Sequence, residues 1–141
     1  MKTKTSELTG RNLNWAVAIA LGWKWKVDND GKIVLARPAK NIHSKKAFDT
    51  LGLAYFQPTK SWSTAGPIIE REEIRLDTND HPDLWPWVAN KLIRWEKRED
   101  EEMGDWPVYA EGVGDTPLIA AMRCYVASVL GDEVEIPEEL K

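Results

Sequence analysis

The chain has 141 residues, of which 43% are apolar and 30% are charged, and its formal net charge is −4 at pH 7. These values are typical of one soluble globular domain spanning residues 1–141, and they argue against a disordered or fibrous protein. The longest apolar run, Trp15 to Leu21, is too short to span a membrane, and no signal-peptide pattern precedes it. We therefore expect a cytoplasmic protein. Cys124 is the only cysteine, which excludes an intrachain disulfide.

Charge is distributed unevenly along the chain. Residues 1–60 contain 11 Lys and Arg against 4 Asp and Glu, whereas residues 61–141 contain 8 against 19. A basic half can indicate a nucleic-acid partner, but the longest basic cluster is only Lys45-Lys46. The two halves are expected to neutralise each other in the fold, and direct nucleic-acid binding is not expected.

The first third of the chain predicts a buried helix followed by a β-hairpin. The helix runs from Gly10 to Leu21, between Thr9 as N-cap and Gly22 as stop, and it is apolar on two faces. Alternating residues at 23–27 and an apolar run at 32–36 then flank Asp30-Gly31, with Pro38 after them, which is the pattern of two antiparallel strands.

The middle of the chain is less regular. We expect, in order, a short helix closed by Gly52, a strand, a polar loop that carries Trp62, and a strand or strand-turn. Their ranges are 44–51, 53–56, 57–66 and 67–74.

The C-terminal half predicts two helices and two strands. Asp83 is a suitable cap for a helix from Leu84 to about Arg98, whose apolar face would carry Leu84, Val88, Leu92 and Trp95. Pro86 falls in its first turn, where the missing N–H costs nothing. An acidic surface turn at 98–105 and a strand at 106–110 follow.

The last helix has the clearest local signals. Thr116 caps it, Pro117 is its first residue, Gly131 closes it, and apolar residues recur at three- and four-residue spacing. The alternating acidic tail at 133–140 predicts an edge strand. Together the elements indicate an α+β domain, in which an N-terminal and a C-terminal helix pack on an antiparallel sheet.

Three ordered segments of the sequence read KTSELTG (4–10) with LNWAVA (13–18), PTKSW (58–62) with GPIIERE (66–72), and TPLIAAMRCYVAS (116–128) with LGDEV (130–134). Together these segments resemble the NinX-like family of small tailed-phage proteins. Residues 32–44 and 85–106 depart from the family pattern. The resemblance implies a phage accessory protein expressed inside a bacterium, and it implies no activity because the family is a domain of unknown function.

Two arginines are candidate ligand-binding residues. Arg123 is the only charged residue between Asp115 and Asp132, on a helix that is otherwise apolar or small. It either forms a structural ion pair, for example with Glu70, or clamps an anion. Arg71 is either tied to its acidic neighbours or contacts the ligand.

Trp62 and Thr116 complete the candidate set. Trp62 follows Ser61 in a stretch rich in hydroxyls, so its indole either fills the core or stacks on a base or sugar. Thr116 follows Gly112 and Gly114 at a helix N-terminus, where backbone N–H groups can hold a phosphate, although glycine turns before helices are common.

No recognisable catalytic constellation, metal site or cofactor motif accompanies these residues. His43 and His81 are isolated, and a phosphate-binding P-loop is missing from the sequence. Cys124 lies among apolar residues, where a thiol is usually inert. The acidic run at 70–73 offers paired carboxylates for hydrolysis, but such a run is more often a solvated edge.

Three functions remain open at this point. The first is a non-enzymatic binding protein that helps a phage against its host, for instance by sequestering a phosphate-bearing nucleotide signal. Its ligand-binding residues are Trp62, Arg123, Arg71, Glu70, Ser61 and Thr116. The second is a modulator that docks on a host protein through the acidic, Trp-rich half. The third is a small hydrolase acting on a nucleotide or glycan. The sequence leaves open whether the chain forms a homo-oligomer.

Overall fold

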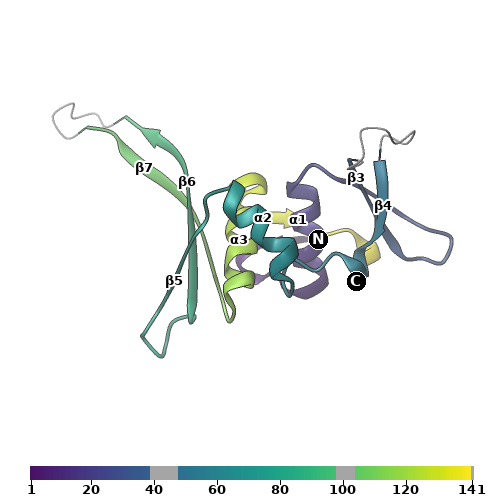
Figure 1. The fold of residues 1–141 in the computed structure, drawn as a ribbon, viewed down its shortest axis with the longest axis horizontal. Coiled ribbons are helices and arrows are strands. Elements are labelled where there is room, and N and C mark those ends of the chain that lie inside the picture. Colours follow the sequence, from purple (N-terminus) through teal and green to yellow (C-terminus); the bar gives the residue numbers. More distant parts are fainter. Residues whose placement is uncertain (39–47, 98–103, 141) are drawn as a thin grey trace.

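The computed structural model describes residues 1–38, 48–97 and 104–140. It places three α-helices between two three-stranded β-sheets (Figure 1). The helical elements are η1 (Thr5–Glu7), α1 (Gly10–Ala20), η2 (Leu53–Tyr55), α2 (Trp62–Arg71), α3 (Pro117–Leu130) and η4 (Glu138–Leu140). The strands are β1 (Lys2–Lys4), β2 (Lys24–Val27), β3 (Ile33–Pro38), β4 (Phe48–Gly52), β5 (Arg75–Thr78), β6 (Trp87–Glu96), β7 (Trp106–Gly114) and β8 (Glu133–Glu135). They form three antiparallel sheets, ordered β1-β8, β2-β3-β4 and β5-β6-β7. The predicted α+β class is confirmed, but three sheets take the place of the one expected.

The C-terminal helix α3 lies at the centre of the core, against α1 on one side and the β5–β7 sheet on the other. It begins as predicted, with the Ile119 N–H donating to Thr116 Oγ1 at 3.2 Å and Pro117 in the first turn. It ends before Gly131, whose φ of +91° favours glycine. Its apolar stripe is buried from Leu118 to Val126, which confirms the prediction from spacing there. The stripe was expected to continue to Val129, but this side chain is exposed.

Two glycines of β7 let α3 approach the sheet closely. Gly112 and Gly114 lie in the strand rather than in a phosphate-binding loop. A Cβ atom on Gly112 would collide with the α3 backbone at Ala120 and Cys124. The glycine pair that precedes the helix therefore serves helix–sheet packing.

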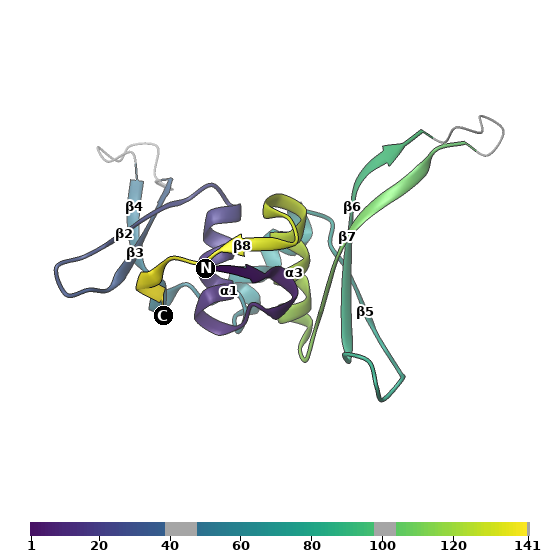
Figure 2. The same cartoon turned by 180° about the vertical axis from the view of Figure 1, so that it is seen from behind.

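The N-terminal helix α1 is buried on two faces, as predicted, with Leu13, Val17 and Trp15 inside the core. The Trp15 and Trp25 rings meet edge to face at 5.9 Å. Strand β1 pairs with β8, which confirms the predicted edge strand in the tail and joins the two ends of the chain (Figure 2). Thr9 is the N-cap of α1, but its side chain makes no capping hydrogen bond.

The predicted hairpin is confirmed as β2 and β3. Asp28 Oδ1 accepts hydrogen bonds from the N–H groups of Asp30 and Lys32, and Gly31 has a φ of +78°. β4 then pairs with the free edge of β3, so the helix predicted at 44–51 is wrong for residues 48–51. Residues 44–47 lie outside the described residues.

The segment from 53 to 74 contains the largest local corrections. Residues 53–55 form a 3₁₀ turn instead of a strand, and α2 replaces both the polar loop around Trp62 and the start of the strand expected at 67–74. Ser61 caps α2 by accepting from the Thr64 N–H at 3.4 Å. Pro67 lies inside α2, and the helix continues through it because the packing against α3 outweighs one missing hydrogen bond.

The helix predicted from Leu84 to about Arg98 is also wrong, because residues 87–96 form β6. This strand pairs with β5 on one edge and with β7 on the other. The strand predicted at 106–110 is confirmed as the start of β7. The acidic turn predicted at 98–105 falls mostly on residues 98–103, which lie outside the described residues. In the described ranges, no helix has both the length and the apolarity that a membrane span requires.

Candidate ligand-binding groove

A groove of about 690 Å³ lies between α2 and the β2–β4 sheet, and we call it the α2 groove. Its lining combines aromatic rings, aliphatic side chains, two hydroxyls and two arginines: Leu21, Trp23, Arg37, Pro38, Leu51, Tyr55, Phe56, Ser63, Thr64, Pro67, Ile68, Arg71 and Tyr125. Its volume falls within the range of about 300–1,000 Å³ that is usual for small-molecule sites. Because no carboxylate of the described residues lines it and two arginines do, the groove favours an anion.

Arg37 and Arg71 carry the positive charge of the groove. Arg37 comes from the end of β3, and its Nε–H is buried without a hydrogen-bond partner in the part of the chain that the structure describes. Asp49 stands opposite Arg37 in the β3–β4 register, but no ion pair joins these two described residues. An unsatisfied buried donor is costly, and an anionic ligand would satisfy it.

Arg71 comes from the last turn of α2 and is held by its neighbour. Its Nε–H donates to Glu72 Oε2 at 3.0 Å, while more than half of the side chain stays exposed. Glu72 Oε1 also lies 3.9 Å from Lys91 Nζ. The guanidinium lines the groove and stays partly exposed, so it can also contact a ligand there.

Aromatic rings form the walls beside these arginines. The Trp23 and Phe56 rings lie 4.7 Å apart at 48°, and Tyr55, 82% exposed, stands at the rim. Tyr125 is buried and its hydroxyl donates to the carbonyl of Ala20 at 3.3 Å. Flat aromatic faces next to arginines suit a planar ligand that carries negative charge.

Burial is the main cause that raises the pKa of Tyr125, and the carboxylate of Glu72 adds to this effect. Arg71 opposes both through its charge and a hydrogen bond with the Tyr125 side chain. The phenol therefore stays protonated at neutral pH, where it supplies an O–H rather than a negative charge.

Of the six predicted ligand residues, Arg71 lines the groove, while Ser61 and Trp62 start the same helix outside its lining. Ser61 Oγ lies 2.9 Å from the hydroxyl of Ser63, which does line the groove. Trp62 is 55% exposed and so does not fill the core. Glu70 is exposed and lies outside the lining.

Arg123 lies apart from this groove and is only 4% exposed. Its Nε–H donates to the Leu8 carbonyl at 2.9 Å, and its Nη1–H donates to the Val113 carbonyl at 2.7 Å. The Trp85 ring stacks 5.5 Å from the guanidinium carbon. Desolvation lowers the pKa of Arg123, and nearby Asp115 opposes this shift. These contacts assign Arg123 to the core, where its hydrogen bonds go to main-chain carbonyls and not to Glu70.

Other reactive side chains do not assemble into a catalytic centre in the described ranges. Thr116 is occupied as the cap of α3, and Glu72 is occupied by Arg71 and Lys91. Burial raises the pKa of the Cys124 thiol to about 12, so the reactive thiolate is scarce at neutral pH. Within those ranges, no group of three or more acidic, His or Cys side chains is arranged to hold a metal.

Arg37, Trp23 and Tyr55 are the groove residues that the sequence did not single out. Arg37 ends the run Ile33-Val34-Leu35-Ala36, so it is a charge beside an apolar strand, the same signal that drew attention to Arg123. Trp23 begins the alternating segment at 23–27, a pattern that is typical of a core side chain. Only the tertiary structure reveals that these residues line one groove with α2.

Comparison with models of protein families identifies a bacteriophage family. A sequence model of the family described as "Bacteriophage P22, NinX" matches residues 4–129. The chain is also similar to a crystal structure described as a phage protein from Bacillus cereus ATCC 14579, with 16% identity and a TM-score of 0.49 over 92% of this chain and 93% of that one. No curated protein matches the chain.

Proposed function

The chain belongs to the family of bacteriophage P22 NinX, and from that premise we propose that it is a non-enzymatic accessory protein that binds a flat anionic ligand in the α2 groove. It acts inside the bacterial host, where such proteins are made. The observation that carries the proposal is the presence of two arginines, one with a buried unsatisfied Nε–H, beside aromatic walls. No carboxylate in the described part of the chain lines this groove.

A nucleotide is the ligand class that fits this combination best. Its base is planar and suits the faces of Trp23 and Tyr55, and its phosphate suits paired guanidinium groups. For a phage accessory protein, holding a phosphate-bearing nucleotide signal of the host would be a form of counter-defence. Sequestration needs affinity and no turnover, which agrees with a groove built from donors and rings.

Removal of either groove arginine is expected to weaken nucleotide binding at least tenfold. A charge-assisted hydrogen bond to phosphate is worth about 1.5–3 kcal/mol, and about 1.4 kcal/mol corresponds to a factor of ten in Kd. A thermal-shift screen of cyclic and linear nucleotides identifies the binder, and calorimetry then compares wild type with Arg37→Ala and Arg71→Ala. Arg94→Ala is the matched control, because Arg94 is an exposed arginine on β6.

Two outcomes would overturn this assignment. One is a nucleotide panel without any binder, since a ligand that binds only the native state must raise its melting temperature. The other is equal affinity in the two groove variants and in Arg94→Ala, which would place the bound nucleotide outside the α2 groove.

The β6–β7 ribbon favours a second function, docking on a host protein. Its outer half extends away from the helices (Figures 1 and 2). Several large apolar side chains of this ribbon are exposed. These residues are Leu92, Ile93, Trp95, Trp106 and Tyr109. Tryptophan and tyrosine dominate the binding energy of many protein interfaces, so a ribbon of this kind suits a partner.

Trp95→Ala is expected to abolish capture of a host partner if the ribbon is the docking surface. Trp95 is 60% exposed, so its removal leaves the core intact. Tagged wild type, Trp95→Ala and Tyr55→Ala are compared in pull-downs from host lysate. A protein retained by wild type and Tyr55→Ala but lost with Trp95→Ala supports docking through the ribbon. Equal recovery with all three proteins contradicts it.

A further inference from the structure

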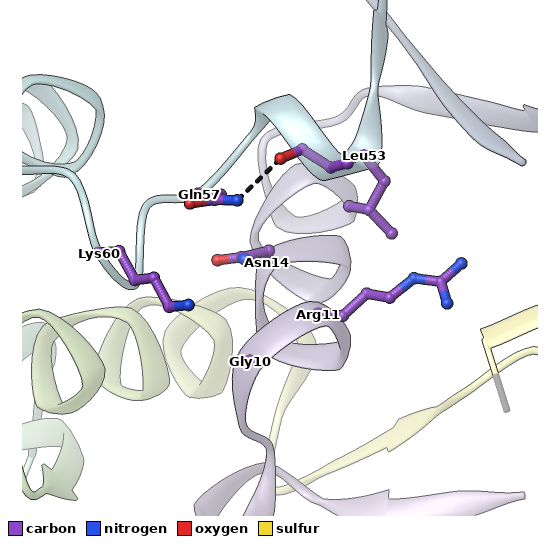
Figure 3. Close-up of a pocket in the computed structure, with 7 residues that line it drawn as sticks. Gly10, Arg11, Asn14, Leu53, Gln57 and Lys60 are labelled. Carbon is purple, nitrogen blue, oxygen red and sulfur yellow. Dashed lines mark hydrogen bonds between the residues drawn. The ribbon is translucent and has the colours of Figure 1, made fainter.

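A second, smaller cavity of about 270 Å³ lies between the first turns of α1 and the segment around η2 (Figure 3). Its lining includes Gly10, Arg11, Asn14, Leu53, Gln57 and Lys60. We call it the α1 cleft. It shares no lining residue with the α2 groove, although η2 contributes residues to both. Its volume is below the range of about 300–1,000 Å³ that is usual for drug-sized ligands, so it suits a small group.

The start of α1 presents free backbone donors to this cleft. Helix N-termini carry N–H groups without intrahelical partners and a partial positive charge. The Thr9 side chain does not cap them. Within the described part of the chain, the N–H groups of Gly10, Arg11 and Asn12 have no hydrogen-bond acceptor. Gly10 has a φ of +49°, a backbone conformation that favours glycine, at the point where the chain enters the helix.

The Asn14 side chain is the independent observation that points to a ligand. Asn14 is only 6% exposed and lines the cleft. Its Oδ1 accepts from the Thr59 N–H at 3.2 Å, and this bond fixes which end of the amide is oxygen. The Nδ2 amino group has no acceptor among the described residues. The side-chain amide of this nearly buried residue therefore offers the cleft two N–H donors that have no acceptor among the described residues.

The charges around the cleft select an anion. Arg11 and Lys60 both line it, and no carboxylate does among the residues that the structure describes. In Figure 3 the Lys60 ammonium group approaches the first turn of α1 from one side, and Arg11 extends on the other side below Leu53. The Gln57 side chain is held over the cleft, with its Nε2 donating to the Ala54 carbonyl at 2.8 Å.

We propose that the α1 cleft binds a phosphate group, through the N-terminal N–H groups of α1, the Asn14 amide and the Lys60 ammonium. Phosphate matches this site because its several oxygens accept from several donors at once and because its negative charge suits both the helix end and the cations. The site is independent of the nucleotide proposed for the α2 groove. Free phosphate and a phosphate monoester present the same chemistry to it.

A titration of the ¹⁵N-labelled protein with inorganic phosphate, at constant ionic strength, tests this site by NMR. Saturable shifts are expected at the amides of Gly10, Arg11 and Asn12. Asn14→Asp is expected to weaken the affinity at least tenfold, because the new carboxylate still accepts from Thr59 but replaces the free donor with negative charge. Lys60→Ala is expected to weaken it about threefold or more, since one exposed cation is lost.

Controls separate this site from a general effect of charge. Lys26→Ala removes an exposed lysine of β2 and should leave the phosphate affinity unchanged. Arg71→Ala should also leave it unchanged, so the α1 cleft and the α2 groove are tested separately. A titration with glycerol phosphate distinguishes a phosphate ester from free phosphate as the ligand. Tighter binding than that of inorganic phosphate identifies an ester, and equal binding identifies the free anion.

The proposal is overturned if wild type shows no saturable shift at these amides, or if Lys60→Ala and Lys26→Ala bind phosphate equally well. Lys60 is exposed, so its variant folds and remains informative even if Asn14→Asp does not. Shifts that spread over the basic face without saturation would mean diffuse charge attraction, and they also count against a built site.

Discussion

Gly112→Ala is expected to lower the free energy of unfolding by about 3 kcal/mol or more, the largest effect of any single methyl group in this protein. The added Cβ would lie 2.9 Å from Cys124 Cα and closer still to the Ala120 carbonyl oxygen and the Cys124 nitrogen. All three are backbone atoms in the middle of α3, so relief requires the helix to move away from the β5–β7 sheet. Urea denaturation, compared at the transition midpoint, measures the loss.

Substitutions at two other glycines provide comparisons for the loss of stability expected in Gly112→Ala. A Cβ on Gly114 would meet the Ile119 side chain at 2.7 Å, and a side chain yields more readily than backbone, so Gly114→Ala should cost less. Gly52→Ala is the matched control. Gly52 has an ordinary φ of −60°, and its new Cβ would meet only the exposed Tyr55 ring at 3.3 Å. That variant should stay within about 1 kcal/mol of wild type. A wild-type midpoint for Gly112→Ala would contradict the close helix–sheet packing.

Arg123→Met is expected to lower the free energy of unfolding by about 2–3 kcal/mol, because two carbonyl groups lose their donors in the core. Arg123 holds three parts of the chain together: α3 itself, the Leu8 carbonyl after η1, and the Val113 carbonyl in β7. Methionine keeps an apolar side chain and removes the charge. Burying the charge of Arg123 has a desolvation cost, which also lowers its pKa. The variant avoids this cost, so part of the lost stability is regained. Thermal and urea unfolding measure the difference.

Two comparisons decide what Arg123 does. Arg94→Met is the control, because Arg94 pairs with Glu96 on the exposed part of β6 and should change stability by less than about 0.5 kcal/mol. Arg123→Lys restores the charge but not the planar donor geometry, so it should recover only part of the loss. If Arg123→Met kept wild-type stability and lost ligand binding, the anion clamp suggested by the sequence would hold after all.

One part of the candidate site could be predicted from the sequence, and the other part could not. Arg71 was identified because it sits in an unusual charged run of a family segment, and it does line the α2 groove. Arg37 lies 34 positions earlier, in the β2–β3 hairpin, which local sequence signals predict by themselves. No sequence pattern between Arg37 and Arg71 indicates that they line the same groove. Arg123 was singled out correctly as an unusual residue, but whether a buried guanidinium serves a ligand or the backbone depends on which carbonyls the fold brings to it.

The sequence by itself determined the family, the α+β class and the elements whose signals are contiguous: α1, the β2–β3 hairpin, the start of β7 and α3. These elements have caps, turns and apolar spacing within one short window, so local energies decide them.

Only the tertiary structure decided β4, α2 and β6. The spacing of Leu84, Val88, Leu92 and Trp95 fits a helix, yet pairing with β5 and β7 satisfies more hydrogen bonds and makes residues 87–96 a strand. The helix α2 forms despite Pro67 because it packs against α3. A strand needs partners from elsewhere in the chain, and a groove needs two elements to meet. Both depend on contacts between distant residues, and local sequence patterns do not encode them.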